Sequence, residues 1–457
     1  MNANLRESIG SCELRDDMMV NMSAITSRVF ASVCLPVVGF PGSAQPWEPG
    51  PLPVTLPDGE VVDTARRSTY FRPRAASMLY GTNASDARRR LHLLISEPTV
   101  GDTVVVGVEL LEIPTWGMHS SEPFWLVSLH LELSADDPIC GLAAWVHTEP
   151  DTPAGREMRQ RLESLIGPEL QVRSGWRRAQ SLCLVEPGVA LSTPVGAPAS
   201  WDPLTAWLWQ SASTTTFDHF VPDTDDPNLL DGMLYLSSAW RALVLRDGAS
   251  FVLRGEAGTF SRQARAYFQT IYTDVLQLAM LQTVCLDTFA DHLSAIGNRF
   301  TKAHELRVLV NALTEYRNVL WWEDITAHGV GNELLRGMHQ ARRTSELFDR
   351  VTSDLETFRE QVETQATQEL SASTQADEER SRRFERFASV TAIAFALPLL
   401  VLTAMLLPIE GVTAGDHAFS LWFVLVFSGG LVAAGALAGT IVAAVLGRVR
   451  ARRAATE

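Results

Sequence analysis

The fold is decided near the C-terminal end of the chain by FASVTAIAFALPLLVLTAMLL at residues 387–407 and FSLWFVLVFSGGLVAAGALAGTIVAAVL at residues 419–446. Neither run contains Lys, Arg, Asp or Glu, and each has the roughly 20 apolar residues needed to cross a hydrocarbon core about 30 Å thick. A backbone in lipid must satisfy its own hydrogen bonds, which favours helices. Because only residues 408–418 join the two runs, they predict a hairpin of two transmembrane helices.

Arginine side chains flank the predicted hairpin on the two sides away from its loop. Four lie at 380–386 and four at 448–453, whereas the loop carries Glu410 and Asp416 and neither Lys nor Arg. Lys and Arg are enriched on the cytoplasmic side of membrane proteins. We therefore expect a multi-pass protein of the inner (plasma) membrane, in contact with the lipid bilayer and with both ends of the chain in the cytoplasm.

Composition and motifs argue against several classes of protein. The net charge is -15 and no basic stripe lies outside the membrane flanks, which argues against a nucleic-acid partner. The sequence has no GxSxG motif, P-loop, dinucleotide fingerprint or HExxH pair, so we expect no catalytic residues and no enzyme. Five scattered cysteines without a CxxC pair indicate reduced thiols, with neither a disulfide framework nor a zinc site.

The part of the chain before residue 258 is typical of a mixed α/β domain. Residues 103–113 and 124–133 are rich in β-branched and aromatic residues and predict strands. The clearest hairpin is ALVLRDGASFVLRG, in which Asp247 and Gly248 separate two apolar runs. The expected organisation is a mixed α/β cytosolic domain at 1–257, a helical region with a long stalk helix at 258–386, transmembrane helices at 387–407 and 419–446, an outer loop at 408–418 and a basic cytosolic tail at 447–457.

The helical region contains no proline from residue 260 to 387. It predicts a helix at about 261–297, a second at about 302–327 that ends at HGVGN, and a third that begins near Thr344. Apolar residues of the third helix recur at spacings of three and four from Leu347 to Leu370, a narrow seam of the kind that faces other helices. Continuous into the first apolar run, this helix would be about 95 Å long at 1.5 Å per residue. We therefore expect a homo-oligomer built around it.

This order of segments resembles the CorA superfamily of magnesium and divalent-cation transporters. RFERFASVTAIAFALPLLVLTAMLL is similar to the family's stalk-to-membrane segment, and WWED at 321–324 to its helical region. The resemblance is best from about Leu347 to Arg453 and does not include the first 250 residues. It implies an α+β N-terminal domain, a helical stalk, two transmembrane helices and five subunits around a pore. It also implies that Mg²⁺ or another divalent cation binds between the cytosolic domains.

The sequence departs from that family at the outer mouth of the pore. Leu407, Pro408 and Ile409 stand where the family has its Gly-Met-Asn signature. Apolar side chains offer no ligand to a hydrated divalent ion, so the scaffold can be inherited without magnesium selectivity. Residues at helical spacing form a candidate pore face, with packing between helices or against lipid as the alternative: Arg386, Ser389, Ile393, Leu397, Leu400, Ala404 and Leu407.

Carboxylates are densest in the loop at 221–232, which is the candidate metal site. Asp223, Asp225 and Asp226, with Asp231 nearby, are hard oxygen ligands, although Pro227 rules out an EF-hand. A solvated loop is the alternative. Further acidic residues are candidates for bridging cations between subunits, with a charged helix surface as the alternative: Glu323, Asp324, Asp349, Asp354 and Glu356. No other cofactor is expected.

Two functions remain open on the sequence. The first is a divergent CorA-like cation channel or transporter, homo-oligomeric, with altered or lost magnesium selectivity. The second is a membrane-anchored sensor or effector of a bacterial conflict or stress system, which keeps the CorA scaffold without transport. In the second, the cytosolic domain reads a signalling ligand or a partner protein. The unmatched first 250 residues and the missing filter favour the second function.

Overall fold

The structure is a computed structural model of the 457-residue chain. It describes residues 28–406 and, beyond them, Val426 and Gly430. Within 28–406 the description leaves out residues 44, 57–58, 60, 82–89, 96–98, 101–102, 117–121, 134–136, 187–190, 255–258 and 297–302. Packing divides the chain into two compact units, 1–366 and 367–457.

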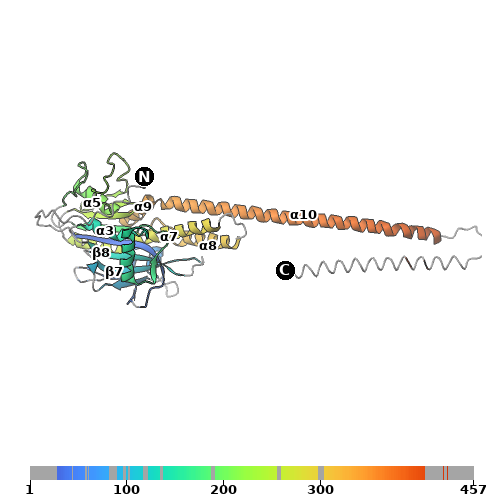
Figure 1. The fold of residues 1–457 in the computed structure, drawn as a ribbon, viewed down its shortest axis with the longest axis horizontal. Coiled ribbons are helices and arrows are strands. Elements are labelled where there is room, and N and C mark those ends of the chain that lie inside the picture. Colours follow the sequence, from blue (N-terminus) through green and yellow to red (C-terminus); the bar gives the residue numbers. More distant parts are fainter. Residues whose placement is uncertain are drawn as a thin grey trace, which may run out of the picture. The chain divides into compact units, whose positions relative to one another are not determined.

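A mostly antiparallel sheet forms the centre of the first unit (Figure 1). Its strand order is β11-β12-β13-β10-β1-β8-β7-β5-β2, with β9 paired to β1 and β6 paired to β7, while β3 and β4 form a separate pair. The strands are β1 (Arg28–Gly39), β2 (Glu48–Pro49), β3 (Val54–Thr55), β4 (Val61–Val62), β5 (Arg90–Leu94), β6 (Thr99–Val100), β7 (Thr103–Ile113), β8 (Phe124–Leu133), β9 (Leu170–Val172), β10 (Gln180–Glu186), β11 (Met233–Leu234), β12 (Trp240–Leu245) and β13 (Gly248–Leu253). The strands predicted at 103–113 and 124–133 and the Asp247-Gly248 hairpin are confirmed.

Strand β1 lies in the middle of the sheet and is buried on both faces. Its side chains alternate between two apolar clusters: Val33 belongs to one, whereas Phe30 and Cys34 belong to the other. This is why the sequence at 29–38 reads as an almost unbroken apolar run. β-Branched and aromatic residues, such as Val29, Phe30 and Val33, suit such a strand.

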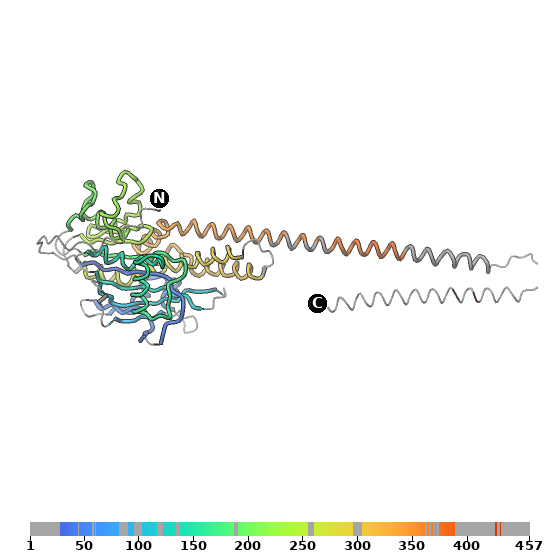
Figure 2. The backbone as a smooth tube through the Cα atoms, viewed as in Figure 1, coloured from blue at the N-terminus to red at the C-terminus, as the bar shows by residue number. Residues whose placement is uncertain are grey.

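The face of the sheet that Val33 shares is covered by α3 (Pro138–Val146), α4 (Pro153–Ile166) and α5 (Pro203–Ser213). Each begins with a proline after a capping side chain, as in α4, where the Thr152 hydroxyl accepts from the Gly155 backbone N–H. The opposite face carries α1 (Thr64–Tyr70), α2 (Pro73–Tyr80) and the helices that follow residue 258 (Figure 2).

The helix predicted at 261–297 is present but is not a plain α-helix. It consists of α6 (Thr259–Tyr267), a π-helix η2 (Phe268–Tyr272) and α7 (Thr273–Ile296) in direct succession. The Thr273 hydroxyl donates to the carbonyl of Phe268, five residues earlier, at 2.9 Å. Single π-helical turns inside α-helices occur frequently at functional sites.

The helices after α7 are α8 (Ala303–Val319), α9 (Gly329–Arg342) and α10 (Thr344–Leu406). The predicted start near Thr344 is confirmed, but the helix expected to continue to residue 327 ends at Val319, and HGVGN opens α9. The Asn332 side chain stabilises this turn by accepting from the backbone N–H groups of Ile325 and Thr326 at 2.9 and 3.1 Å. Arg343, in the left-handed region with φ 56°, separates α9 from α10.

Membrane-spanning helices are the main point at which expectation and structure differ. Among the described residues, no helix is long and apolar enough to cross a membrane. The predicted fold with two transmembrane helices, at 387–407 and 419–446, is therefore contradicted for the described residues, which include 387–406 but only Val426 and Gly430 of the second run. The predictions that depended on it, a CorA-like architecture with two transmembrane helices, an ion-transport role and a multi-pass location in the plasma membrane, are corrected with it.

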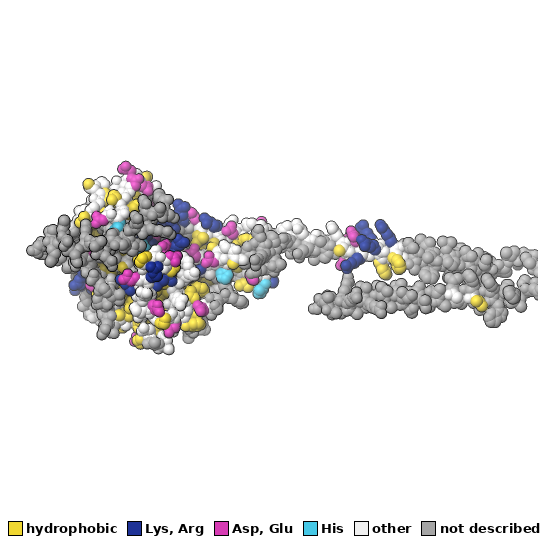
Figure 3. All heavy atoms as spheres, viewed as in Figure 1, with side chains coloured by type: hydrophobic (Ala, Val, Ile, Leu, Met, Phe, Trp, Pro, Cys, Tyr) yellow, Lys and Arg dark blue, Asp and Glu magenta, His cyan; other side chains and the backbone are white. Residues whose placement is uncertain are grey.

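The first apolar run continues α10 without a break, and α10 ends at Leu406 after 63 residues, so the predicted long helix is confirmed. The side chains of 389–406 lie outside the description. The described side chains of α10 from 359 to 388 are all exposed, and acidic and basic residues pair along it, as in Arg359–Glu363 and Arg383–Glu379. Figure 3 shows these charged side chains beside exposed apolar ones. The run at 419–446 lies outside the described residues apart from Val426 and Gly430, as do the loop at 408–418 and the tail at 447–457.

Candidate functional site

A row of polar side chains crosses the sheet on the face that α7 covers. His92 on β5 lies opposite Glu109 on β7, Glu109 opposite Ser128 on β8, and Ser128 opposite Cys34 on β1. Residues opposite one another on antiparallel strands share a face. All four are buried. The row therefore places a carboxylate in the centre of an apolar layer, where it needs partners.

Those partners form a buried cluster of two arginines and two carboxylates, which we call the ionic cluster: Arg67, Arg90, Glu109 and Asp274. Arg90 Nη2 donates to Glu109 Oε2 at 2.6 Å and to Asp274 Oδ1 at 2.5 Å. Arg67 Nη1 lies 3.4 Å from Asp274 Oδ1 and 3.6 Å from Glu109 Oε1. The Tyr80 hydroxyl donates to Asp274 Oδ2 at 2.5 Å. The cluster thus joins α1, α2, β5 and β7 to the first turn of α7.

The electrostatics of the ionic cluster favour the charged state of Glu109. Burial alone would raise the pKa of Glu109, but Arg90, His130 and Arg67 together hold it well below its usual range. Burial also raises the pKa of the Tyr80 phenol, and the charge of Asp274 raises it further. The phenol therefore remains a hydrogen-bond donor, and the Glu109 carboxylate remains an acceptor.

The ionic cluster also holds the segment that precedes β3. The Leu52 backbone N–H donates to Glu109 Oε1 at 2.6 Å, and the Leu52 carbonyl accepts from the Arg67 guanidinium. Gly107 on β7 makes room for this residue, because a Cβ atom there would lie 2.6 Å from Leu52 Cδ1. Val54 and Thr55, two and three residues after Leu52, line a cavity.

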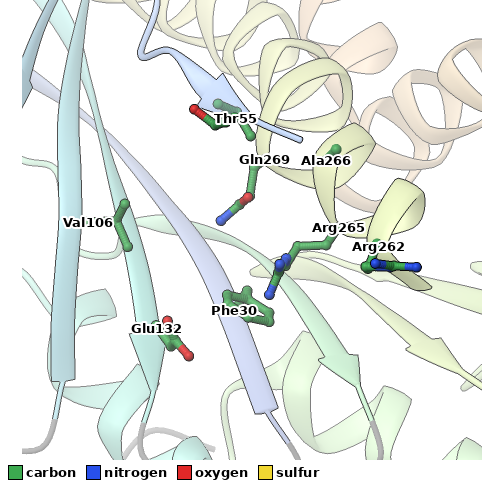
Figure 4. Close-up of a pocket in the computed structure, with 9 residues that line it drawn as sticks. Phe30, Thr55, Val106, Glu132, Arg262, Arg265, Ala266 and Gln269 are labelled. Carbon is green, nitrogen blue, oxygen red and sulfur yellow. The ribbon is translucent and has the colours of Figure 1, made fainter. Parts of the chain in front are cut away.

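The cavity has a volume of about 250 Å³ and lies between the sheet, β3 and the α6–η2 segment. Phe30, Val106 and Glu132 line it from β1, β7 and β8. Figure 4 shows Arg265 and Gln269 extending from the helix toward these residues. The Arg265 guanidinium carbon lies 5.1 Å from the centre of the Phe30 ring. The remaining lining residues are Val54, Thr55, Arg262 and Ala266.

A second carboxylate lies close to the cavity on β10. Burial raises the pKa of Glu186, whereas Arg265 and Arg28 lower it and Glu132 raises it. Its Oε1 atom is buried and has no hydrogen-bond partner among the described residues. The surroundings of the cavity therefore mix guanidinium groups with carboxylates.

The far half of α7 is connected to α10 through a second buried polar residue, Gln282. Its Nε2 donates to the carbonyl of Leu320 at 2.8 Å, and its Oε1 lies 2.6 Å from Nε2 of His339 on α9. The Trp321 ring stacks on His339 at 5.1 Å and on Phe348 of α10 at 4.6 Å. Residues of the WWED segment thus act as packing residues between α7, α9 and α10.

The residues proposed from sequence as metal ligands do not form a common site. Asp223 and Asp226 accept from backbone N–H groups two residues later, at 3.0 and 2.9 Å, so both carboxylates shape turns in an exposed loop. Asp324 pairs with Arg72 and with Asn332. Among the described residues, no group of three His, Cys, Asp or Glu side chains is placed to hold a metal ion. Asp225, Asp231, Glu323, Asp349, Asp354 and Glu356 are exposed or at the surface of loops and α10.

The proposed pore-lining residues lie on α10 or beyond it. Arg386 is exposed, and the backbone of Ser389, Ile393, Leu397, Leu400 and Ala404 is helical, but their side chains lie outside the described part. Leu407, Pro408 and Ile409 also lie outside it. Of the seam residues, Val351 and Leu355 are 3% and 6% exposed and belong to the core of the first unit.

Neither the ionic cluster nor the cavity was predicted from the sequence. A signal for the cluster exists, because Glu109 and Asp274 are carboxylates inside mostly apolar stretches, VGVELLEI, which also holds Glu112, and IYTDVLQLAM. A charge in such a stretch is buried only with a partner. Arg262 and Arg265 carry no comparable signal, since arginines on an amphipathic helix are ordinary surface residues.

The comparisons with known proteins found no relative of this chain. No family model matches the chain, and no curated protein or solved structure matches it either. The resemblance to the CorA superfamily therefore stays a prediction from the sequence.

Proposed function

We propose that this chain is a ligand sensor, in which a molecule bound in the cavity beside η2 shifts α7 and, through α7, the start of α10. The observation that carries the proposal is that two sides of the cavity converge on the ionic cluster. The β3 side is tied to it through Leu52, which contacts both Glu109 and Arg67. The η2 side is tied to it through Asp274, two residues after the π-helix.

Such a connection suits signalling because the joined parts are buried and tightly packed. Arg67, Glu109 and Asp274 have no exposed side-chain surface. A packed interior does not deform continuously, so a small displacement at a ligand site is converted into a discrete repacking. A ligand that presses on β3 or on Gln269 of η2 would change the distances within the ionic cluster and hence the position of α7.

The output we propose is α10. Gln282 of α7 holds the turn at Leu320 through a hydrogen bond, and the neighbouring Trp321 stacks on Phe348 in the first turns of α10. Only Arg343 separates α9 from α10, so a shift of α9 is passed on without a flexible linker. The contacts from the cavity to α10 therefore form an uninterrupted series.

We further propose that α10 associates with other copies of itself. Its described side chains from 359 to 388 are exposed, among them Phe384 with 58% of its surface accessible. A helical stretch with so few buried side chains depends on ion pairs along its surface or on partner helices. Self-association through this stretch would let a ligand-dependent shift of α10 reach a second subunit.

The proposal can be tested without knowledge of the natural ligand. Thr55 lines the cavity, so Thr55→Cys in a Cys12→Ser, Cys140→Ser background provides a single attachment point for N-ethylmaleimide, a neutral group that fills the cavity. The remaining cysteines, Cys34, Cys183 and Cys285, are buried. We expect amide hydrogen exchange to change at 273–281 and 344–358 after labelling, together with the self-association measured by light scattering.

The matched control is Gln263→Cys in the same background. Gln263 is exposed on α6 but does not line the cavity. Its label should leave exchange in α7 and α10 unchanged. Identical exchange in α7 for labelled and unlabelled Thr55→Cys protein would refute the sensor.

A further inference from the structure

The side chains around the cavity define the chemistry of the molecule that it accepts. We infer that it binds a small organic anion, with a carboxylate or phosphate group held by Arg265 and Arg262 and a hydroxyl or amino group facing Glu132. The inference rests on the proposed function, because it names the ligand class of the same cavity.

The anionic group is assigned from the two arginines. Arg262 and Arg265 are three residues apart and so lie on one face of α6. No carboxylate lies within 4.0 Å of either guanidinium among the described residues. The Arg265 guanidinium carbon lies over the Phe30 ring, a cation–π contact that leaves the N–H groups for hydrogen bonds to a ligand. A guanidinium edge matches carboxylate and phosphate oxygens.

The donor group of the ligand is assigned from Glu132 and from the balance of charge. Glu132 lines the cavity from β8, opposite Phe30 on β1. Among the lining residues, Arg262 and Arg265 carry two positive charges and Glu132 carries one negative charge when ionised, which leaves one positive charge. A single anionic group neutralises that excess. A hydrogen-bond donor beside it gives Glu132 a partner, whereas a bare anion would be repelled by this carboxylate.

The size of the ligand follows from the cavity. Its volume of about 250 Å³ exceeds the roughly 150 Å³ of a cavity that holds benzene and is below the roughly 300–1,000 Å³ of pockets for drug-sized molecules. Phe30, Val106 and Ala266 supply apolar surface for a carbon skeleton. A metabolite with on the order of ten non-hydrogen atoms fits these limits.

The test uses four probes with the full chain: lactate, which has an anion and a donor; propionate, without the donor; lactamide, without the charge; and glycerol 3-phosphate, as the phosphate counterpart of lactate. Binding is followed by ligand-observed NMR at millimolar concentrations. We expect lactate or glycerol 3-phosphate to bind more tightly than propionate, and lactamide not to bind. Whichever of the two anions binds more tightly identifies the carboxylate or the phosphate as the preferred group.

Two variants of cavity residues and one control variant test whether the anion binds in the cavity. Arg265→Gln should weaken binding of the better anion roughly ten- to a hundredfold, the range expected for loss of a charge-assisted hydrogen bond. Glu132→Gln should remove the preference for lactate over propionate. Arg336→Gln, which replaces an exposed arginine on α9, should change neither. Thermal unfolding of each variant verifies that it is folded.

The outcomes separate this inference from the sensor. Binding of none of the anions, equal binding of lactamide, or unchanged binding to Arg265→Gln would overturn the ligand class. If the maleimide on Thr55→Cys still changes exchange in α7, the sensor stands and only the ligand class fails. If an anion binds through Arg265 but neither it nor the maleimide changes exchange in α7, the ligand class stands and the sensor fails.

Discussion

Arg90 and Asp274 are 184 residues apart in the chain, yet Nη2 of Arg90 donates to Oδ1 of Asp274 at 2.5 Å in the interior of the first unit. Their side chains are 1% and 0% exposed. The pair fixes the first turn of α7 against the sheet next to the π-helix. Because Arg90 also pairs with Glu109 at 2.6 Å, removal of one carboxylate leaves a buried positive charge with a single partner.

Loss of the Asp274 charge should destabilise the first unit. Asp274→Asn removes one of two carboxylates that neutralise Arg67 and Arg90, and breaking a buried pair on one side costs about 3–5 kcal/mol. We expect the urea midpoint to fall accordingly. Asp354→Asn is the control, since this exposed carboxylate on α10 should change the free energy of unfolding by less than about 0.5 kcal/mol. Equal stability of the two variants would contradict a structural role for the ionic cluster.

Acid should unfold the protein partly through Glu109. Its pKa is well below the usual value in the folded state, so its contribution to stability is complete above the unfolded pKa of about 4.3 and is lost as pH falls below it. Glu109→Gln should flatten the dependence of unfolding free energy on pH below about 4.3. An unchanged slope in this window would show that Glu109 does not titrate on unfolding.

Protonation of His339 should destabilise the folded state at a higher pH than protonation of Glu109. Burial lowers its pKa from 6.5 to about 4, so the folded state requires the neutral ring. Its contribution is complete above about pH 6.5 and is lost as pH falls through about 4, which corresponds to about 3 kcal/mol. His339→Gln should remove this slope between about pH 6.5 and 4 while leaving the Glu109 window unchanged. Denaturant titrations at several pH values measure both variants, and a wild-type slope in His339→Gln would disprove the assignment.

A methyl group at Gly107 should disturb the wall of the cavity. A Cβ atom there would lie 2.6 Å from Leu52 Cδ1 and 3.1 Å from the Leu93 carbonyl oxygen, so the Leu52 side chain must shift. We expect Gly107→Ala to cost about 1–3 kcal/mol through overpacking. Gly141→Ala is the matched control, because its Cβ would make an ordinary contact at 3.5 Å with Leu133 Cδ2. Thermal melts of the two variants measure the loss of stability. A melting temperature of Gly107→Ala equal to that of the wild type would show that the Leu52 side chain shifts at no cost.

The start of α10 should stabilise the subunit itself. Leu355 is 6% exposed in the core of the first unit, so Leu355→Ala should lower the free energy of unfolding by about 2–5 kcal/mol. Glu356→Ala, on the exposed side of the same turn, should have little effect. Light scattering of Leu355→Ala at low denaturant separates loss of folding from loss of association. A variant that dissociates without losing stability would place the seam between subunits.

Several of the long strands were predictable because local composition determines them. Strands buried on both faces, such as β1, must be apolar at nearly every position, and the Asp247-Gly248 turn fixes a hairpin by backbone preference alone. The start of α10 at Thr344 was predictable for the same reason, since apolar periodicity begins there. These features depend on residues close together in the sequence.

Tertiary structure alone decided the parts on which function depends. Glu109, Asp274, Arg67 and Arg90 come from four separate elements, and only the strand register and the placement of α7 bring them together. The cavity likewise requires β3 to lie beside α6, a contact that no local pattern encodes. The apolar run at 387–407 shows both sides of this division. The sequence predicted one helix from near Thr344 into the run, and α10 is a 63-residue helix that ends at Leu406. The composition of the run also predicted that it crosses a membrane, yet no described helix is long and apolar enough to do so. Unbroken helical propensity along the chain determines such a helix, whereas the rest of the molecule decides what its side chains contact.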